Sequence, residues 1–393
     1  MVEIALALVL LIGAGLMIRT LNALWSIDPG FRPDNVLSFG LSFPPSMRAV
    51  SPEARRAALR DLSERLNSMP GVKAASFLTG ASPMQGLEGV FFWLDGQPKP
   101  ASTSEMKQAL VYRVEPGYLT AMGIPLKQGR FFTAQDETGT QPVVVIDEIF
   151  ARQYFPSADP LGKRIKLEDN RGPSEIVGVV GHVKQSGLDS DDRQSLRAQL
   201  YLPFRQFGWS SEVGVVARVE GAARTTATAH FEALRRVVHS QHSHNVIYEP
   251  QTMNEVIADS LSRRRFAMIL LNAFAVVALL LSSIGLYGVV SYLVGQSAHE
   301  LGIRLALGAQ RADVLLLVLG QGLKMALGGV ALGLLAARGL TRLLEKMLYG
   351  VSATDLMTFT VIPLLLISVA LFACFVPAWR ATKVDPLIAL RSE

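Results

Sequence analysis

The sequence predicts a membrane protein with four transmembrane helices and one large α+β domain outside the membrane. Charged residues make up 18% of the 393 residues, below the roughly 25% of soluble domains, and this deficit is concentrated in a few long apolar runs. Residues 28–262, between the first two runs, have the composition of an ordinary soluble domain. The single cysteine excludes an internal disulfide. The net charge of +5 suits an anionic lipid surface as well as nucleic acid.

The first predicted helix lies within residues 1–27. Its apolar run, Ile4 to Ile18, is short for a span unless the helix continues through Arg19 to Trp25, because crossing the membrane takes about 20 residues. Glu3 stands where a signal peptide carries Lys or Arg, and no clear cleavage site follows. The sequence therefore favours an uncleaved anchor, and its abrupt beginning suggests that a further segment precedes it.

Three more helices are predicted towards the carboxy terminus, at about 266–295, 318–344 and 356–379. Phe266 to Ala298 contains no charged residue, and a membrane helix can tolerate a proline such as Pro363. Gly329 and Gly333 have a spacing that either packs against another helix or reflects the general frequency of small residues in membrane helices. Lys324 could sit at the membrane interface if the third span begins after it.

The extramembrane domain is predicted to combine a split α/β module with an inserted β-rich lobe at about 85–205. The halves of the module, at about 34–80 and 211–250, each read strand, helix, strand. The elements of the two halves are Asn35–Phe43, Pro52–Met69 and Val72–Leu78, then Glu212–Val219, Ala222–Ser240 and Val246–Tyr248. The strands predicted in the lobe are Phe91–Leu94, Leu110–Val114, Val143–Ile146, Glu175–Val180 and Gln199–Pro203. We expect one sheet assembled from both ends of the domain.

Motifs for catalysis or nucleotide hydrolysis are incomplete, so no enzyme activity is predicted. Around Leu161–Arg164 the phosphate-binding loop pattern fails twice, because Ser157 replaces the first Gly and an Arg replaces the final Ser or Thr. His239, His242 and His244 could bind a transition metal. No carboxylate or cysteine completes that set, which favours solvated residues at a helix end.

The connection after the second span runs from Glu300 to Arg311 and mixes small residues and a charged pair with apolar Ile303, Leu305 and Leu307. This composition predicts a short surface helix. The helix either docks onto another protein or lies on the lipid surface, and the residue pattern weighs the two nearly equally.

Several segments also carry a family resemblance. The run from Glu300 to Ala309, Glu-Leu-Gly-Ile-Arg-Leu-Ala-Leu-Gly-Ala, resembles the signature of the MacB/FtsX-like ABC transporter permeases, and Pro377 to Leu390 is similar to that family's carboxy-terminal motif. Pro116 to Arg130 and Asp159 to Lys163 resemble its MacB-like periplasmic core. The motifs occur in the family's order over nearly the whole chain. Particularly close is the carboxy-terminal module of the acidobacterial-type duplicated orphan permeases, which lack a fused ATPase.

The resemblance implies a multi-pass permease of the bacterial inner (plasma) membrane with a cytoplasmic amino terminus. Residues 28–262 would form the periplasmic core, with a porter-like α/β half and the β-rich lobe, and residues 263–393 the FtsX-like permease domain. Basic residues near the span ends favour the opposite orientation, since more of them lie on the proposed outer side. The family orientation is kept because long loops are weakly governed by that rule.

The resemblance also implies the partners. A separate cytoplasmic ATPase would bind ATP, while this chain would hold no cofactor or metal. The loop facing that ATPase would be formed by Glu300, Gly302, Arg304, Gly308 and Ala309. Membrane lipid and either a second copy of the chain or a second permease module are the other expected partners, and nucleic acid is not expected.

The function expected from this family is that of a permease subunit in an ABC-type export or mechanotransmission system. Two alternatives remain open at the level of sequence. The chain could be a membrane-anchored periplasmic binding or regulatory protein that transports nothing, or it could be the partial product of a duplicated permease gene. No residue pattern names the cargo.

Overall fold

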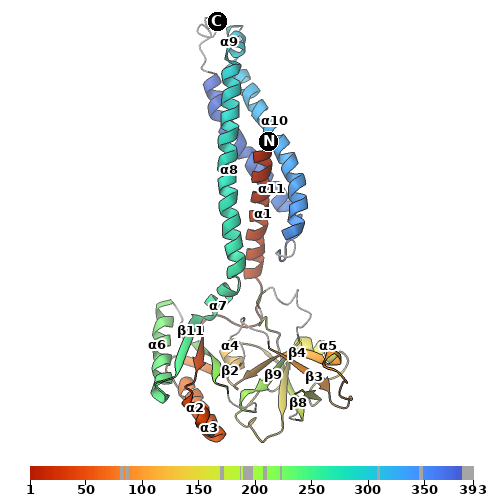
Figure 1. Ribbon diagram of the computed structural model, residues 1–393, viewed down its shortest axis with the longest axis vertical. Coiled ribbons are helices and arrows are strands. Elements are labelled where there is room, and N and C mark those ends of the chain that lie inside the picture. The colour runs from red at the N-terminus through yellow and green to blue at the C-terminus, as the bar shows by residue number, and fades with distance from the viewer. Residues whose placement is uncertain are drawn as a thin grey trace. The chain divides into compact units, whose positions relative to one another are not determined.

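The computed structural model of this chain describes residues 1–79, 84, 88–168, 172–185, 187–188, 198–206, 210–221, 224–307, 310–344 and 348–382. The chain forms two units (Figure 1). We call them the helical unit, which comprises Met1–Ser26 and the chain from Ser262 onward, and the α+β unit, Ile27–Leu261.

In the described part of the chain, four helices of the helical unit are long and apolar enough to cross a membrane, as the sequence predicted. They are α1 (Val2–Trp25), α8 (Ser262–Gln296), α10 (Arg311–Leu344) and α11 (Leu356–Ala381). α10 begins earlier than the expected residue 318, because the apolar pattern continues through Val314 to Leu319. Lys324 therefore lies within the helix on an exposed face.

α1 packs against α8, α10 and α11. α1 lies close to α10 at the two glycines, where an added Cβ would lie 2.7 Å from Ile4 Cβ at Gly329 and 2.9 Å from Leu8 Cδ2 at Gly333. Of the two interpretations of this glycine spacing, the structure therefore supports helix packing. Near the other end of α1, Arg19 forms an ion pair with Asp355, the residue that caps the amino terminus of α11.

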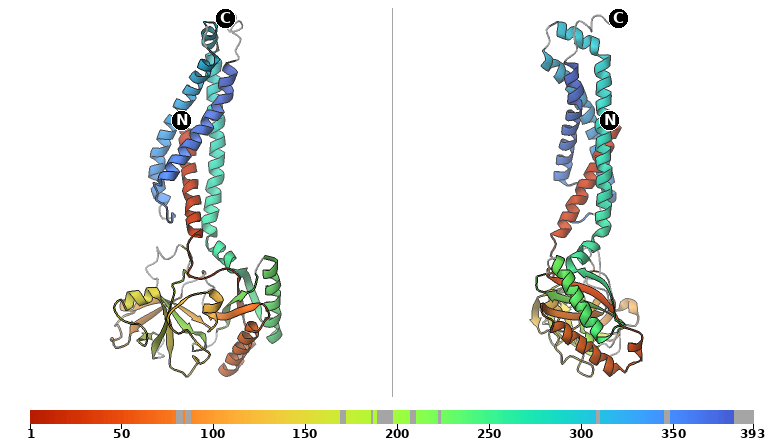
Figure 2. Two further views of the ribbon diagram at one scale, coloured as in Figure 1. Left: turned by 180° about the vertical axis from the view of Figure 1, so that it is seen from behind. Right: turned by 90° about the vertical axis from the view of Figure 1, so that its left-hand side faces the viewer.

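One part of the α+β unit is an α/β module with an antiparallel sheet in the order β11–β1–β10–β2. The strands are β1 (Val36–Ser42), β2 (Val72–Thr79), β10 (Glu212–Val219) and β11 (Val246–Thr252). The helices α3 (Pro52–Asn67) and α6 (Arg224–Gln241) connect the strands of each half and lie side by side (Figure 2). Leu37, Phe39 and Leu41 alternate along β1 and are buried in one core with residues of both helices. One sheet is thus assembled from both halves, as expected.

The second part is a closed barrel, because the strand pairings return to their starting point. β3 pairs with β4 and β7, β7 with β8, β8 with β6, β6 with β9, and β9 with β4. The strands are β3 (Gly89–Leu94), β4 (Lys107–Val114), β6 (Val143–Asp147), β7 (Arg164–Leu167), β8 (Pro173–Val180) and β9 (Gln199–Pro203). Phe92, Val111, Ile146 and Leu200 belong to its buried core. β2 also pairs with the end of β4, so the module and the barrel share a strand.

Several short elements complete the α+β unit and join its two parts. They are α2 (Ser46–Ala49), α4 (Tyr118–Met122), α5 (Glu148–Tyr154), α7 (Met253–Ser260), β5 (Leu126–Gly129) and the 3-10 turns η1 (Thr103–Glu105) and η2 (Phe204–Gln206). Side-chain caps explain two of the helix starts. Asp147 accepts a hydrogen bond from Phe150 N–H at α5, and Thr252 and Glu255 form a capping box at α7.

Candidate functional site

The connection between α8 and α10 contains α9 (Ala298–Ala306), the surface helix that the sequence predicted. Leu301 is 2% exposed and belongs to a buried cluster with Val314, Val318 and Ala378. Its backbone N–H donates to Ser297 O at 2.9 Å. One face of α9 is therefore anchored on the helical unit.

Another side of α9 is open. Glu300, Ile303, Arg304 and Leu307 follow the spacing i, i+3, i+4, i+7, which places them along one side of a helix. Leu307 is 82% exposed and Ile303 is 37% exposed, and Glu300 forms an ion pair with Arg304. We call these four residues the α9 stripe. Its two apolar and two charged side chains suit contact with another surface, and none of them is a nucleophile.

The residues predicted to face an ATPase are only partly described. Glu300, Gly302 and Arg304 lie in α9, whereas Gly308 and Ala309 lie outside the described residues. α10 begins soon afterwards, where the Asp313 carboxylate accepts a hydrogen bond from Gln310 N–H at 3.0 Å. The acidic first turn caps this helix and orients the chain as it leaves the connection.

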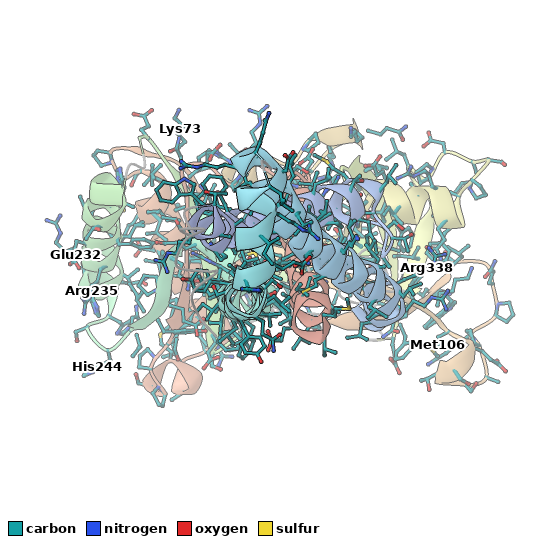
Figure 3. The ribbon with its side chains drawn as sticks, turned by 90° about the horizontal axis from the view of Figure 1, so that it is seen from above. Lys73, Met106, Glu232, Arg235, His244 and Arg338 are labelled. Atoms are coloured by element: carbon teal, nitrogen blue, oxygen red, sulfur yellow. The ribbon has the colours of Figure 1, made fainter. Side chains whose placement is uncertain are left out.

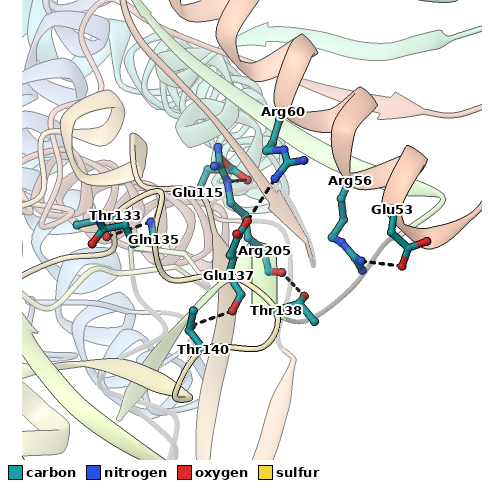
Figure 4. A network of polar contacts seen from close by, with 10 residues as sticks. All are labelled: Glu53, Arg56, Arg60, Glu115, Thr133, Gln135, Glu137, Thr138, Thr140 and Arg205. Atoms are coloured by element: carbon teal, nitrogen blue, oxygen red, sulfur yellow. Dashed lines mark hydrogen bonds and ion pairs between the residues drawn. The ribbon is translucent and has the colours of Figure 1, made fainter.

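In the α+β unit, a buried ion pair lies where the module meets the barrel (Figure 4). Nε and Nη2 of Arg205 donate to Glu115 Oε2 at 3.1 and 2.9 Å, and the two side chains are 16% and 5% exposed. Arg60 on α3 reaches Glu137 at 3.2 Å, and Thr138 Oγ1 donates to the Arg205 carbonyl at 2.9 Å. The cavity among these residues is about 20 Å³, room for one water molecule. This network joins structural elements and leaves no space for a solute.

A second buried polar group, Asp147, orients a histidine. Asp147 is fully buried, and one carboxylate oxygen accepts from Phe150 N–H at 2.8 Å and from Gln199 N–H at 3.0 Å. Its other oxygen lies 2.6 Å from His182 Nδ1. The backbone N–H of His182 donates to Glu148 Oε1 at 3.3 Å. These contacts fix the imidazole ring of His182 in one orientation.

Two open clefts lie beside His182 and its neighbours. The first, of about 310 Å³, is lined by His182, Asp28, Arg32, Lys127 and Glu148 among others. The second, of about 500 Å³, shares Lys127 and Glu148. Among the described residues that line either cleft there is no Ser, Thr or Cys, so these linings offer the imidazole no hydroxyl or thiol to activate. The clefts suit polar contact with a solute or a peptide.

Tyr118, at the start of α4, is buried. Burial raises the pKa of its phenol to about 12, and the hydrogen bond that Gln185 Nε2 donates at 3.1 Å opposes this effect. The phenol is therefore protonated at neutral pH. Tyr118 packs against Tyr201, with ring centroids 6.2 Å apart, which makes it a packing residue.

The histidine cluster shows no metal geometry. His239 lies on α6, and His242 and His244 follow the helix at the surface, with His244 at the outer edge of the unit (Figure 3). Within the described ranges, no group of three or more His, Cys, Asp or Glu side chains is arranged to hold a metal ion.

The sequence-based search missed the buried polar groups of the α+β unit. A local signal existed for Asp147, which follows the apolar run of β6 and precedes a helix, the position of a helix cap. His182, Glu115 and Arg205 carry no such signal, because each lies far in sequence from the residue that it contacts.

Comparison with known proteins matches the chain over nearly its full length. The family model of the MacB-like periplasmic core domain matches residues 5–236, and that of the FtsX-like permease C-terminal domain matches residues 272–386. The macrolide export ATP-binding/permease protein MacB of Acinetobacter baylyi is 27% identical over 72% of this chain and 43% of its own length. The chain thus spans less than half of that protein.

The chain is also similar to a second permease and to one solved structure. An uncharacterized ABC transporter permease of Bacillus subtilis, YknZ, is 26% identical over 84% of this chain and 83% of its own length. Among solved structures, the periplasmic region of MacB from Actinobacillus actinomycetemcomitans aligns with 58% of this chain and 92% of that region, at 17% identity and a TM-score of 0.37.

Proposed function

This chain belongs to the family of ABC transporter permeases that combine a MacB-like periplasmic core domain with an FtsX-like permease domain, and we propose that it is the transmembrane subunit of an export or mechanotransmission system. A separate cytoplasmic ATPase supplies the energy, and the chain couples that motor to the α+β unit on the periplasmic side. In this arrangement the chain lies in the inner membrane with its amino terminus in the cytoplasm.

The observation that carries the proposal is the α9 stripe. A helix anchored by Leu301 and open along Glu300, Ile303, Arg304 and Leu307 can receive a push from a soluble partner without unfolding. The anchor cluster includes residues of α10 and α11. Movement of α9 is therefore transmitted to the packed helices, because closely packed interiors transmit displacement.

The α+β unit fits the same proposal as the part that moves. Its split module has two strand-helix-strand halves that close into one sheet, a porter-like arrangement. A second copy of the chain, or a second permease module, would complete a symmetric pair around an ATPase dimer. The substrate would be a solute or polypeptide on the periplasmic side, reached through the clefts beside His182.

The test uses photo-cross-linking from α9 in intact native cells. A photoreactive residue replaces the exposed Leu307, and the matched control carries it at the buried Leu301. We expect the first variant, and not the second, to capture a nucleotide-binding ATPase. Capture of lipid or of periplasmic proteins alone from Leu307 would overturn the proposal and favour the membrane-anchored binding protein.

Exchanging the charges of Glu300 and Arg304 tests whether a partner recognises this pair in the α9 stripe. The double variant Glu300→Arg, Arg304→Glu keeps an ion pair along the helix but reverses its direction, which makes the pair somewhat less stabilising. We expect export activity and ATPase capture to fall together, while α9 remains folded. Full activity of this variant would show that a partner does not recognise the charged pair.

A further inference from the structure

The segment that follows α1 is held by both parts of the α+β unit. Lys184 N–H donates to Pro29 O at 2.9 Å, Arg32 N–H donates to Met122 O at 2.8 Å, and Val219 N–H donates to Asn35 O at 2.8 Å. These bonds join residues 28–35, which we call the entry segment, to three different places in the fold. They are the chain after β8, the end of α4 and the end of β10.

The side chain of Arg218 on β10 forms hydrogen bonds with both α4 and the entry segment. Its Nε donates to the carbonyls of Thr120 and Ala121 at 3.2 and 2.9 Å. Its Nη1 donates to Asp34 O, and its Nη2 to Arg32 O, each at 2.9 Å. The guanidinium thus binds two carbonyls of α4 and two of the entry segment.

The chemistry of arginine explains why this residue type suits the position. A guanidinium holds its N–H donors in a fixed plane, and the carbonyls in the last turn of a helix lack intrahelical partners. A cation is also favourable at a helix carboxy terminus. Gly123 ends α4 in the left-handed region (φ 70°), and an added Cβ there would lie 3.1 Å from Arg218 Nη2. The glycine therefore leaves room for the guanidinium.

The other connection to the helical unit is built differently. α7 precedes α8 and packs on β1 and β11 through buried Met253, Val256 and Ile257. It contacts strands of the α/β module, and Asn254 Nδ2 in α7 donates to Asp34 Oδ1 of the entry segment at 3.4 Å. The entry segment, in contrast, touches α4 and the chain after β8 as well as β10.

We propose that Arg218 is a positioning residue that locks the entry segment to α4, so that a displacement of the first membrane helix reaches the module and the barrel together. The lock itself is inferred from the four hydrogen bonds of Arg218. Its role in transmitting motion rests on the proposed function. A shift of α1 relative to α8 then changes how the two parts of the α+β unit lie, because the entry segment is bonded directly to β10 of the module and to the chain after β8 of the barrel. Among the described residues, α7 packs on strands of the module.

The first test is hydrogen exchange of the full chain in detergent. In Arg218→Met we expect amide exchange to rise at least tenfold in peptides covering residues 27–35 and 118–124, while β2 stays protected. Arg65→Met removes an exposed ion pair with Asp61 and serves as the matched control with no change. Arg218→Lys should restore part of the protection, because an ammonium can bond only some of the four carbonyls. Unchanged exchange in Arg218→Met, or an equal rise across β2, would overturn the inference.

The second test separates a positioning role from a merely stabilising one. In membranes that contain the ATPase partner, we expect Arg218→Met to hydrolyse ATP at the wild-type rate but to lose export, with partial rescue by Arg218→Lys. The ATP-dependent change in exchange that wild type shows in the barrel should be absent. Normal export by Arg218→Met overturns the inference, whereas failure to find any ATPase overturns the proposed function and leaves the exchange result standing.

Discussion

At the scale of single residues, the ion pairs of the α+β unit differ most in their burial. Glu115 and Arg205 are 5% and 16% exposed, whereas Asp61 and Arg65 on α3 are 46% and 51% exposed. An exposed pair contributes little because water screens it and two long side chains lose freedom. A buried pair is costly to break, since one charge is left without a partner.

This contrast predicts the effect of removing one arginine. Arg205→Met should lower the free energy of unfolding of the α+β unit by about 3 kcal/mol, because Glu115 stays buried without its partner. Arg65→Met, the matched exposed variant, should change it by less than about 1 kcal/mol. Urea-dependent pulse proteolysis of the detergent-solubilised protein measures both. Equal effects would show that water reaches Glu115.

A second residue-scale prediction concerns acid stability. Burial of Asp136 opposes its ionisation and by itself would raise its pKa. The hydrogen bonds that the carboxylate accepts from Arg130, at 2.8 and 3.0 Å, and from Thr133 outweigh burial, so the pKa is lowered. A carboxylate with a lowered folded-state pKa stabilises the fold above the unfolded-state pKa, about 3.9. That stability is lost as the pH falls through the folded-state pKa. Asp136→Asn should therefore unfold more easily at pH 7 and lose less further stability below pH 4, in thermal unfolding at several pH values. An acid dependence identical to wild type would contradict this.

At the scale of elements, local pattern predicted those elements that are long and regular. The periodicity of Pro52–Met69 corresponds to α3, and the apolar alternation of Glu212–Val219 corresponds to β10 with the same bounds. β5 and β7 could not be predicted because neither contains an apolar run. Lys127 and Gln128 lie in β5, which is exposed throughout, and Arg164 and Lys166 alternate with the apolar residues of β7. The predicted four-residue strands, Phe91–Leu94 and Val143–Ile146, are apolar throughout.

Closure of the barrel could not be predicted for a related reason. β4 pairs with β9 across some ninety residues of chain, Leu110 with Gln199, and such pairings are not written in any local pattern. The same holds for Arg218, which resembles an ordinary solvent-facing residue of an alternating strand. The α9 helix could be predicted from its composition, but the burial of Leu301 depends on α10 and α11.

The packing of α1 on α10 leads to a prediction at this scale. Gly333→Leu should separate the two helices, because even a Cβ would lie 2.9 Å from Leu8 Cδ2 and 3.0 Å from Ala5 O. Overpacking of this kind typically costs about 1–3 kcal/mol. Gly339→Leu, on the same helix with nothing within 4 Å of an added Cβ, is the matched control. A lower melting temperature of the helical unit in mild detergent is expected for the first variant only, and similar values for both would refute the packing role.

At the scale of the whole molecule, the chain separates into two units whose surfaces suit different surroundings. The helical unit exposes large apolar side chains along α8 and α11, such as Phe274 and Phe372, which suit lipid. The α+β unit buries its two cores separately, one in the module and one in the barrel. Its internal continuity comes from β4, which pairs with β9 along one edge and, along the other edge, with β3 of the barrel and then with β2 of the module at Arg113 and Val114.

The last prediction follows from that continuity. A fragment comprising residues 27–261 should be soluble and folded, because both buried cores consist only of residues within these bounds. It should unfold in one cooperative transition, because β4 and the Glu115–Arg205 pair couple the module to the barrel. Urea unfolding followed by circular dichroism and by tryptophan fluorescence measures this. The fragment carries Trp209→Phe, so that Trp93 in β3 of the barrel is its one tryptophan. Coincident curves are expected. Two separate transitions would mean that the shared strand does not couple the parts, and an insoluble fragment would mean that the α+β unit needs the membrane helices to fold.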